Sequence, residues 1–158
     1  RASRARGAAG GHAGRSCPLV VVCKGDGGKK LILMRHGKST WDFPNMADHD
    51  RPLAERGRRS AVAVGQAIED MEWTPNLILC SDSMRTRETW ARMIEGGPSI
   101  GNARIKFVPE LYGLFDESAC HEIRDAIMGF ASPDDETILL LGHNYGWEMA
   151  VNSLCGTE

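Results

Sequence analysis

Two arginines and two histidines, each found where an apolar segment gives way to polar residues, are the side chains best suited to chemistry. Arg35 and His36 are adjacent and Gly37 follows them, whereas Arg85 and His143 come much later. A guanidinium group pairs with phosphate oxygens in bidentate fashion. A neutral imidazole can attack phosphorus and hold the phosphoryl group covalently. If these side chains meet, they could bind and transfer an anionic phosphoryl group.

The elements that would position these residues are short apolar strands alternating with helices. Three wholly apolar runs predict strands buried on both faces, and a weaker alternating run predicts a fourth. In chain order these four runs are Lys30–Arg35, Asn76–Cys80, Ile105–Pro109 and Thr137–Gly142. Helical spacing predicts helices over 52–71, 83–94, 118–130 and 147–154. The alternation implies an α/β fold with a mostly parallel sheet and helices on both faces, which is a three-layer α/β/α sandwich.

The carboxyl ends of parallel strands meet at one rim of such a sheet, and ligands bind just beyond them. Arg35 and His36 end the first strand, Arg85 follows the second, and His143 follows the last. An Arg-His-Gly sequence alone is more often an ordinary turn. The convergence of all three strand ends is what predicts a phosphate site.

Composition limits the functional classes. The chain of 158 residues fits one domain. A net charge of -2 argues against a dedicated nucleic-acid binder. No apolar run approaches the roughly 20 residues that span a bilayer, so no membrane segment is expected. The cysteines are odd in number and scattered along the chain, which favours free thiols in a reducing compartment. They are Cys17, Cys23, Cys80, Cys120 and Cys155.

The two ends of the chain raise separate questions. Residues 1–30 carry seven basic and one acidic side chain, whereas 31–158 carry twelve basic and twenty acidic ones. We therefore divide the chain into a basic arm, 1–29, and a domain, 30–158. The arm is either disordered or an organelle transit peptide, so the protein is expected in a chloroplast or mitochondrion, or otherwise in the cytoplasm. The chain stops soon after its last predicted helix begins, whereas a sheet of this type usually continues for another strand. Whether the domain is truncated at its C-terminus is therefore left open.

Four motifs resemble the histidine phosphatase superfamily and, within it, the small SixA-like phosphohistidine phosphatase branch, including plastid-targeted plant and algal members. The likeness covers roughly Lys30 to the end and includes the Arg-His-Gly signature, an Asp-x-Asp-Arg-Pro-Leu block, the distal arginine and the second histidine. These motifs stand at 31–39, 48–57, 81–89 and 141–148. The resemblance implies a phosphoglycerate mutase-like fold.

The resemblance also implies a two-step phosphoryl transfer. His36 would accept the phosphoryl group, and Arg35, Arg85 and His143 would grip its oxygens. The reaction requires no metal and no other cofactor. Asp48-His49-Asp50 could chelate a cation, but a solvated loop is favoured because no further ligand cluster is evident.

The proton donor is less well defined than the nucleophile. An alkyl phosphoester needs an acid beside its bridging oxygen. Glu110 stands where larger family members carry such an acid, although it could equally be an exposed loop residue, and Asp42 is the second candidate. If neither serves, a phosphoramidate such as phosphohistidine becomes the more natural substrate. Arg51 could reach the phosphate or pair with a nearby aspartate, and we favour the structural role.

The partner is expected to be a phosphorylated protein or a small phosphate-bearing molecule, and the sequence does not indicate an oligomeric state. The alternative from another class is a non-catalytic phosphate-binding or interaction domain. A cysteine-based phosphatase is excluded, since Cys80 and Arg85 are separated by four residues where that chemistry needs five.

Overall fold

A computed structural model describes residues 20–24, 29–113, 119–143 and 147. Its five strands form one sheet in the order β1-β2-β5-β3-β4. The strands are β1 (Val20–Lys24), β2 (Lys30–Arg35), β3 (Leu77–Cys80), β4 (Arg104–Phe107) and β5 (Thr137–Gly142). Strands β2, β5, β3 and β4 are parallel, and β1 joins the edge of β2 antiparallel. The predicted α/β class with a mostly parallel sheet is confirmed.

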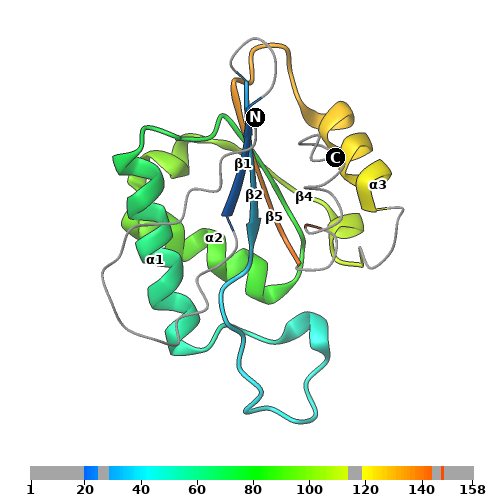
Figure 1. Ribbon diagram of the computed structural model, residues 1–158. Coiled ribbons are helices and arrows are strands. Elements are labelled where there is room, and N and C mark those ends of the chain that lie inside the picture. Colours follow the sequence, from blue (N-terminus) through cyan, green and yellow to red (C-terminus); the bar gives the residue numbers. More distant parts are fainter. Residues whose placement is uncertain (1–19, 25–28, 114–118, 144–146, 148–158) are drawn as a thin grey trace.

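Helices cover both faces of the sheet (Figure 1). The longer ones are α1 (Glu55–Asp70), α2 (Met84–Gly96) and α3 (Ala119–Phe130). Figure 1 shows α1 and α2 on one side of the strands and α3 on the other. Three short 3-10 helices complete the described elements: η1 (Asp48–Asp50), η2 (Pro98–Asn102) and η3 (Pro109–Leu111).

Successive residues of each central strand pack into two different hydrophobic cores, one on each face of the sheet. Ile32 and Met34 of β2 pack in the cluster beneath α1 and α2, whereas Leu33 between them packs in the cluster that includes α3. Leu139 and Leu140 of β5 divide in the same way. Because successive side chains point to opposite faces, a strand buried on both faces must be apolar throughout. This requirement explains why the central strands were recognisable as unbroken apolar runs.

Two boundaries differ from those expected. Strand β1 lies inside the stretch 1–29 that we assigned to the arm, and its backbone pairs with β2 from Val20 opposite Met34 to Lys24 opposite Lys30. Strand β4 ends at Phe107 and not at Pro109, which begins η3 instead. Proline has no N–H to give to a sheet and is well suited to a helix start. The predicted helix 147–154 lies outside the described residues except for Trp147.

Candidate active site

The carboxyl ends of β2, β5 and β3, which are neighbours in the sheet, bring the candidate residues together. His36 follows β2 and its N–H bonds to the Gly142 carbonyl of β5 at 3.0 Å. Ser81 follows β3 and its N–H bonds to the Leu141 carbonyl at 2.9 Å. His143 follows β5 directly. The imidazole rings of His36 and His143 lie with their centroids 5.0 Å apart.

The His36 ring is held in the tautomer that a nucleophile needs. Its Nδ1 lies 2.6 Å from the Gly37 carbonyl oxygen, which can only accept a hydrogen bond. The proton is therefore on Nδ1, and Nε2 keeps its lone pair. Burial lowers the pKa of His36 to about 4, aided by the positive charges of Arg85, Arg35 and Arg51 and opposed by the Gly37 bond. The lowered pKa keeps the ring neutral at pH 7, with the lone pair of Nε2 available.

Arg85 faces both histidines from the first turn of α2. Its Nε lies 3.3 Å from His36 Nε2, and its Nη2 lies 3.4 Å from His143 Nδ1. Only 5% of the residue is exposed. A guanidinium group at this depth is a strong hydrogen-bond donor set for an anion placed beside His36 Nε2.

His143 is nearly buried and is also held neutral. Its Nε2 lies 3.1 Å from the Ser81 hydroxyl, and its Nδ1 faces the guanidinium of Arg85. The Nε2–H therefore donates to Ser81, while Nδ1 accepts. Burial, followed by the charges of His36 and Arg85, lowers the pKa of His143 to about 3, against an opposing effect of Asp48. Ser81 is thus a supporting residue that the sequence did not single out.

The other two predicted site residues, Arg35 and Glu110, are both exposed. Arg35 is exposed at the end of β2, and its positive charge contributes to the lowered pKa of both His36 and His143. Glu110 is exposed on η3, two residues before Tyr112, whose ring lies edge-on to His143 at 5.2 Å. The side chain of Glu110 therefore belongs to a segment that borders the site.

Asp48 is the site residue that sequence reasoning assigned differently. We favoured a solvated loop for 48–50, yet the Asp48 carboxylate contacts Arg85 Nη2 at 3.0 Å, Arg51 Nη2 at 2.8 Å and the Tyr112 hydroxyl at 2.8 Å. The favoured structural role of Arg51 agrees with this ion pair. The three-residue spacing of Asp48 and Arg51 was the one signal in the sequence. Nothing in the pattern around Tyr112 pointed to it.

Asp48 is fully ionised. Burial alone would raise its pKa, but hydrogen bonds from Tyr112 and Arg85 and the charges of Arg85 and Arg51 lower it to about 2. The neighbouring His49 turns away to Asp82, 2.9 Å from its Nε2, and its pKa is raised by that bond. Among the residues that the structure describes, no group of three His, Cys, Asp or Glu side chains could hold a metal ion.

Close backbone packing fixes the loop that carries His36. The Gly37 N–H donates to the Thr89 hydroxyl of α2 at 3.0 Å. At the start of α1, a Cβ on Gly57 would lie 2.2 Å from the Lys38 carbonyl oxygen, closer than two atoms can approach. Glycine at 57 therefore allows α1 to support the turn after β2. The later glycine of the Asp-Arg-Pro-Leu block thus has a physical reason to be there.

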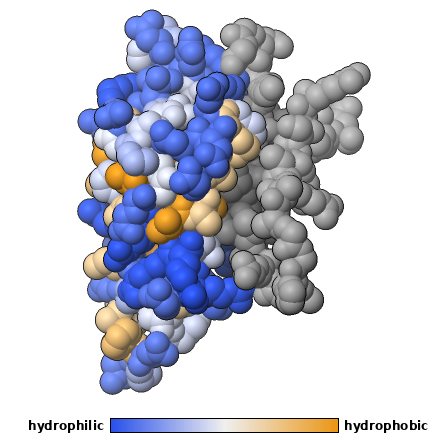
Figure 2. All heavy atoms as spheres, turned by 90° about the vertical axis from the view of Figure 1, so that its left-hand side faces the viewer, coloured by the Kyte–Doolittle hydropathy of each residue, from blue (hydrophilic) through white to orange (hydrophobic). Residues whose placement is uncertain are grey.

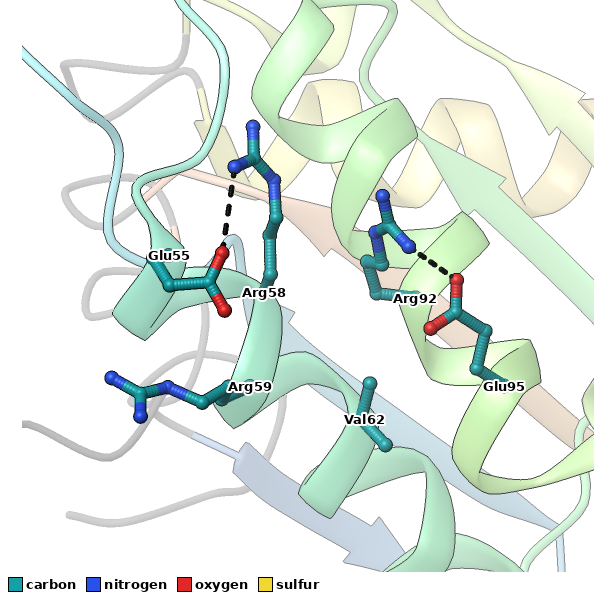
Figure 3. Close-up of a pocket in the computed structure, with 6 residues that line it drawn as sticks. All are labelled: Glu55, Arg58, Arg59, Val62, Arg92 and Glu95. Carbon is teal, nitrogen blue, oxygen red and sulfur yellow. Dashed lines mark hydrogen bonds and ion pairs between the residues drawn. The ribbon is translucent and has the colours of Figure 1, made fainter.

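A separate hollow lies between the outer surfaces of α1 and α2 (Figure 3). Its volume is about 310 Å³, and it is lined by Glu55, Arg58, Arg59, Val62, Arg92 and Glu95. Ion pairs within the lining join Arg58 to Glu55 at 3.7 Å and Arg92 to Glu95 at 2.5 Å. Figure 2 looks onto this side of the molecule, which is largely hydrophilic. None of the side chains proposed for chemistry lines this hollow.

The fold and the site together define a three-layer α/β protein with a cluster of two histidines and a buried arginine at the carboxyl ends of its strands. The family model for the histidine phosphatase superfamily (branch 1) matches residues 31–111. The chain belongs to this superfamily. Within the described residues, no helix is both long and apolar enough to cross a membrane.

Individual relatives agree with this membership. A chloroplastic protein of Arabidopsis thaliana is 38% identical over 132 residues, which cover 82% of this chain and 61% of that protein. This chain therefore spans about three fifths of that relative. A structure from Agrobacterium tumefaciens assigned as phosphohistidine phosphatase SixA has a TM-score of 0.70 and 25% identity, covering 82% of this chain and 78% of the other.

A second structure carries the same assignment. It comes from Nakamurella multipartitia and has a TM-score of 0.64 and 30% identity, covering 77% of this chain and 63% of the other. A phosphoglycerate mutase structure from Plasmodium falciparum has a TM-score of 0.55 and 19% identity, covering 81% of this chain and 69% of the other. The three structures confirm the phosphoglycerate mutase-like and SixA-like fold predicted from the motifs.

Proposed function

We propose that this protein is a phosphohydrolase that acts through a phosphohistidine intermediate on His36, with phosphohistidine or a small phosphomonoester as substrate. The observation that carries the proposal is the state of the His36 ring. Its Nδ1–H is bound to the Gly37 carbonyl, its pKa is about 4, and its Nε2 faces Arg85 at 3.3 Å. A neutral, oriented nitrogen beside a buried cation is what attack on a phosphoryl group requires.

In the first step, Nε2 of His36 forms a bond to phosphorus while the bond from phosphorus to the leaving oxygen or nitrogen breaks. The Gly37 carbonyl stabilises the positive charge that develops on the ring, since it accepts the Nδ1–H. Arg85 and Arg35 donate to the remaining phosphoryl oxygens, and His143 does so through Nδ1 once its ring takes up a proton beside the bound anion. In the second step, water attacks phosphorus while the bond between phosphorus and His36 Nε2 breaks and its electron pair returns to Nε2. The proton of the attacking water passes to solvent, and phosphate and neutral His36 are released.

The leaving group decides which substrate is favoured. An alkoxide must be protonated, and Glu110 is the proposed acid, with Asp42 as the second candidate. Both carboxylates lie in exposed segments, and Asp42 accepts a hydrogen bond from the Thr40 hydroxyl. We expect Glu110→Gln to slow cleavage of a phosphoester at least tenfold and to leave cleavage of phosphohistidine nearly unchanged. Equal losses on both substrates would argue against Glu110 as the acid.

An exposed aromatic loop beside the site supports a protein as the carrier of the phosphoryl group. Trp41 is 71% exposed and Phe43 is 51% exposed. The Arg51 guanidinium stacks on the Trp41 ring at 3.6 Å, which links this loop to the Asp48 and Arg85 cluster. The loop lies at the lower end of Figure 1, and Figure 2 shows apolar spheres at the same height. A small polar substrate would gain little from these rings, whereas a protein surface could cover them.

The test of the nucleophile is phosphoryl labelling. The wild-type protein should form an acid-labile adduct from a phosphohistidine peptide, and His36→Ala should form none. His121→Ala is the matched control, because this exposed histidine lies on α3 outside the cluster. An adduct that survives in His36→Ala would exclude His36. Reversible phosphate binding without any adduct would favour a non-catalytic phosphate-binding domain.

We also propose that the protein acts inside a chloroplast. The Arabidopsis relative is chloroplastic, and the arm 1–29 is basic, with a single acidic residue. A fluorescent fusion of the full chain should enter plastids, and a fusion that lacks residues 1–19 should not. Equal uptake of the two fusions would contradict a targeting role for this stretch.

A further inference from the structure

The Asp48 carboxylate takes hydrogen bonds that a phosphate would also seek. Its Oδ1 accepts from Arg51 Nε at 2.9 Å and from Arg51 Nη2 at 2.8 Å. Its Oδ2 accepts from Arg85 Nη2 at 3.0 Å and from the Tyr112 hydroxyl at 2.8 Å. Two guanidinium groups and a phenol thus surround one carboxylate, which is also the kind of donor set that binds a phosphoryl oxygen.

Arg85 is the group that the carboxylate and a phosphoryl group must share. Its Nε points at His36 Nε2, 3.3 Å away, and its Nη2 lies between Asp48 Oδ2 and His143 Nδ1. A phosphoryl group on His36 Nε2 would accept hydrogen bonds from both Nε and Nη2 of Arg85 as a bidentate pair. The Nη2 atom cannot serve the two anions equally, and the negative charges repel each other at this separation.

The position of Asp48 allows it to leave. Its side chain is 52% exposed, whereas the Arg85 side chain is 7% exposed. Asp48 begins η1, a 3-10 helix of three residues with no buried member. A buried guanidinium needs a counter-charge when no phosphate is bound, and an exposed carboxylate on a short segment can supply one and then swing into solvent.

We propose that Asp48 is an internal anion that occupies Arg85 and Arg51, gives way to the phosphoryl group of the substrate, and returns to help expel the phosphate product. This proposal rests on the proposed function, since it needs a phosphate to bind beside His36. It assigns Asp48 to the exchange of ligands, and not to proton transfer. The pKa of about 2 is consistent with this role because the carboxylate stays charged at every working pH.

A purely structural role predicts the opposite result from the same variant. If Asp48 only positions Arg85, its replacement should weaken phosphate binding. If Asp48 competes with phosphate, removal of its charge should strengthen that binding. Asp48→Asn separates the two roles, because the amide has nearly the same size and still offers one oxygen to Arg51 or Tyr112.

The experiment is a calorimetric titration of the full chain with inorganic phosphate. We expect Asp48→Asn to bind phosphate about tenfold more tightly than wild type, because one negative charge near the site is removed. Its kcat should fall while KM also falls, as slow product release requires. Asp50→Asn is the matched control, since Asp50 lies on the same η1 helix and, among the residues that the structure describes, forms its ion pair with His49 and not with an arginine. Its phosphate affinity should equal that of wild type.

A second variant covers the case in which Asp48→Asn does not fold. Tyr112→Phe removes one of the hydrogen bonds that hold Asp48 in place. We expect it to tighten phosphate binding about threefold, since one hydrogen bond is lost from the competing state.

The outcomes separate this proposal from the proposed function. Equal or weaker phosphate binding by both variants, with normal labelling of His36, would overturn only the exchange role of Asp48. A wild-type protein that neither binds phosphate nor becomes labelled would overturn the proposed function, and the role of Asp48 with it.

Discussion

Two of the places where arginines meet carboxylates in the described structure have opposite consequences. At the strand ends, Arg85 is 5% exposed and contacts Asp48 and two imidazole rings. In the hollow between α1 and α2, Arg92 pairs with Glu95 on one helix, and both side chains are well exposed. Water screens the second pair, so it contributes little energy.

Burial is therefore what distinguishes the two regions. At the strand ends it removes water from around the histidines, so that their pKa values fall to about 4 and about 3 and the lone pairs stay available. It also strengthens each hydrogen bond that Arg85 donates. Both regions contain arginines and carboxylates, so these residue types alone do not distinguish them. The difference is how deeply the side chains are buried at the carboxyl ends of the strands.

The sharpest test of this comparison replaces one arginine in each region by lysine. Arg85→Lys should lower kcat/KM about 10²–10³-fold, because an ammonium group cannot reproduce the fork that reaches His36 and His143 together. Arg92→Lys should leave kcat/KM within about twofold, since its partner is exposed. Steady-state kinetics on one phosphohistidine peptide would measure both. Similar losses of kcat/KM in the two variants would show that the burial of Arg85 is not the cause of its larger effect.

The second prediction concerns pH. A neutral His36 is the reactive form, and its lowered pKa keeps it neutral above about pH 4. We expect kcat/KM to be limited by this group only below pH 4, where it should fall about tenfold per pH unit. Proton NMR should show His36 and His143 titrating near 4 and 3, whereas His49, whose pKa is raised by Asp82, titrates above 6.5.

The lowered pKa of His36 also makes the folding stability depend on pH. The pKa of His36 is lower in the folded state than the 6.5 of the unfolded chain. Above 6.5 the ring is neutral in both states, so it adds no pH dependence. Between 6.5 and 4 the unfolded chain binds the proton more readily, and folding stability falls as the pH is lowered. Chemical denaturation at pH 7 and pH 5 should show this loss, and His36→Asn should reduce it.

The parts of the fold that were predictable are those in which one physical rule decides the structure. The buried strands β2 and β5 began and ended where expected, since burial on both faces allows no polar residue. Strand β1 is apolar in four of its five residues but was missed, because it lies within the stretch 1–29 that the basic charge balance assigned to the arm. Its pairing with β2 shows that the folded domain begins earlier.

The site residues also fall into a group that the sequence predicts and a group that it does not. His36, Arg85 and His143 follow strands or begin a helix, so the topology of the sheet predicts their meeting. Asp48 lies on the 3-10 helix η1 and Tyr112 directly follows the 3-10 helix η3; the path of such short segments depends on tertiary contacts and has no periodic signal. Glu110 lies on such a segment too, and its role stays a prediction for the same reason.

The third prediction tests how α1 supports the loop that carries His36. Gly57→Ala would place a Cβ 2.2 Å from the Lys38 carbonyl oxygen, so α1 or the loop after β2 must move. We expect a loss of about 1–3 kcal/mol in the free energy of unfolding, as for overpacked sites, together with a fall in kcat. Denaturant titration and kinetics would measure both effects. Gly101→Ala is the control, because its Cβ would meet only the Ile94 side chain, at 3.5 Å.

The smallest expected effect lies in the hollow between the helices. Arg92→Ala removes one partner of an exposed i,i+3 ion pair and should change the free energy of unfolding by less than about 0.5 kcal/mol, with the labelling of His36 unchanged. Raising the salt concentration should abolish even this difference, since exposed pairs are screened. A labelling defect in Arg92→Ala would show that the hollow communicates with the strand ends. Because α2 carries Arg85 in its first turn and Arg92 two turns later, that helix would be the element through which such coupling passes.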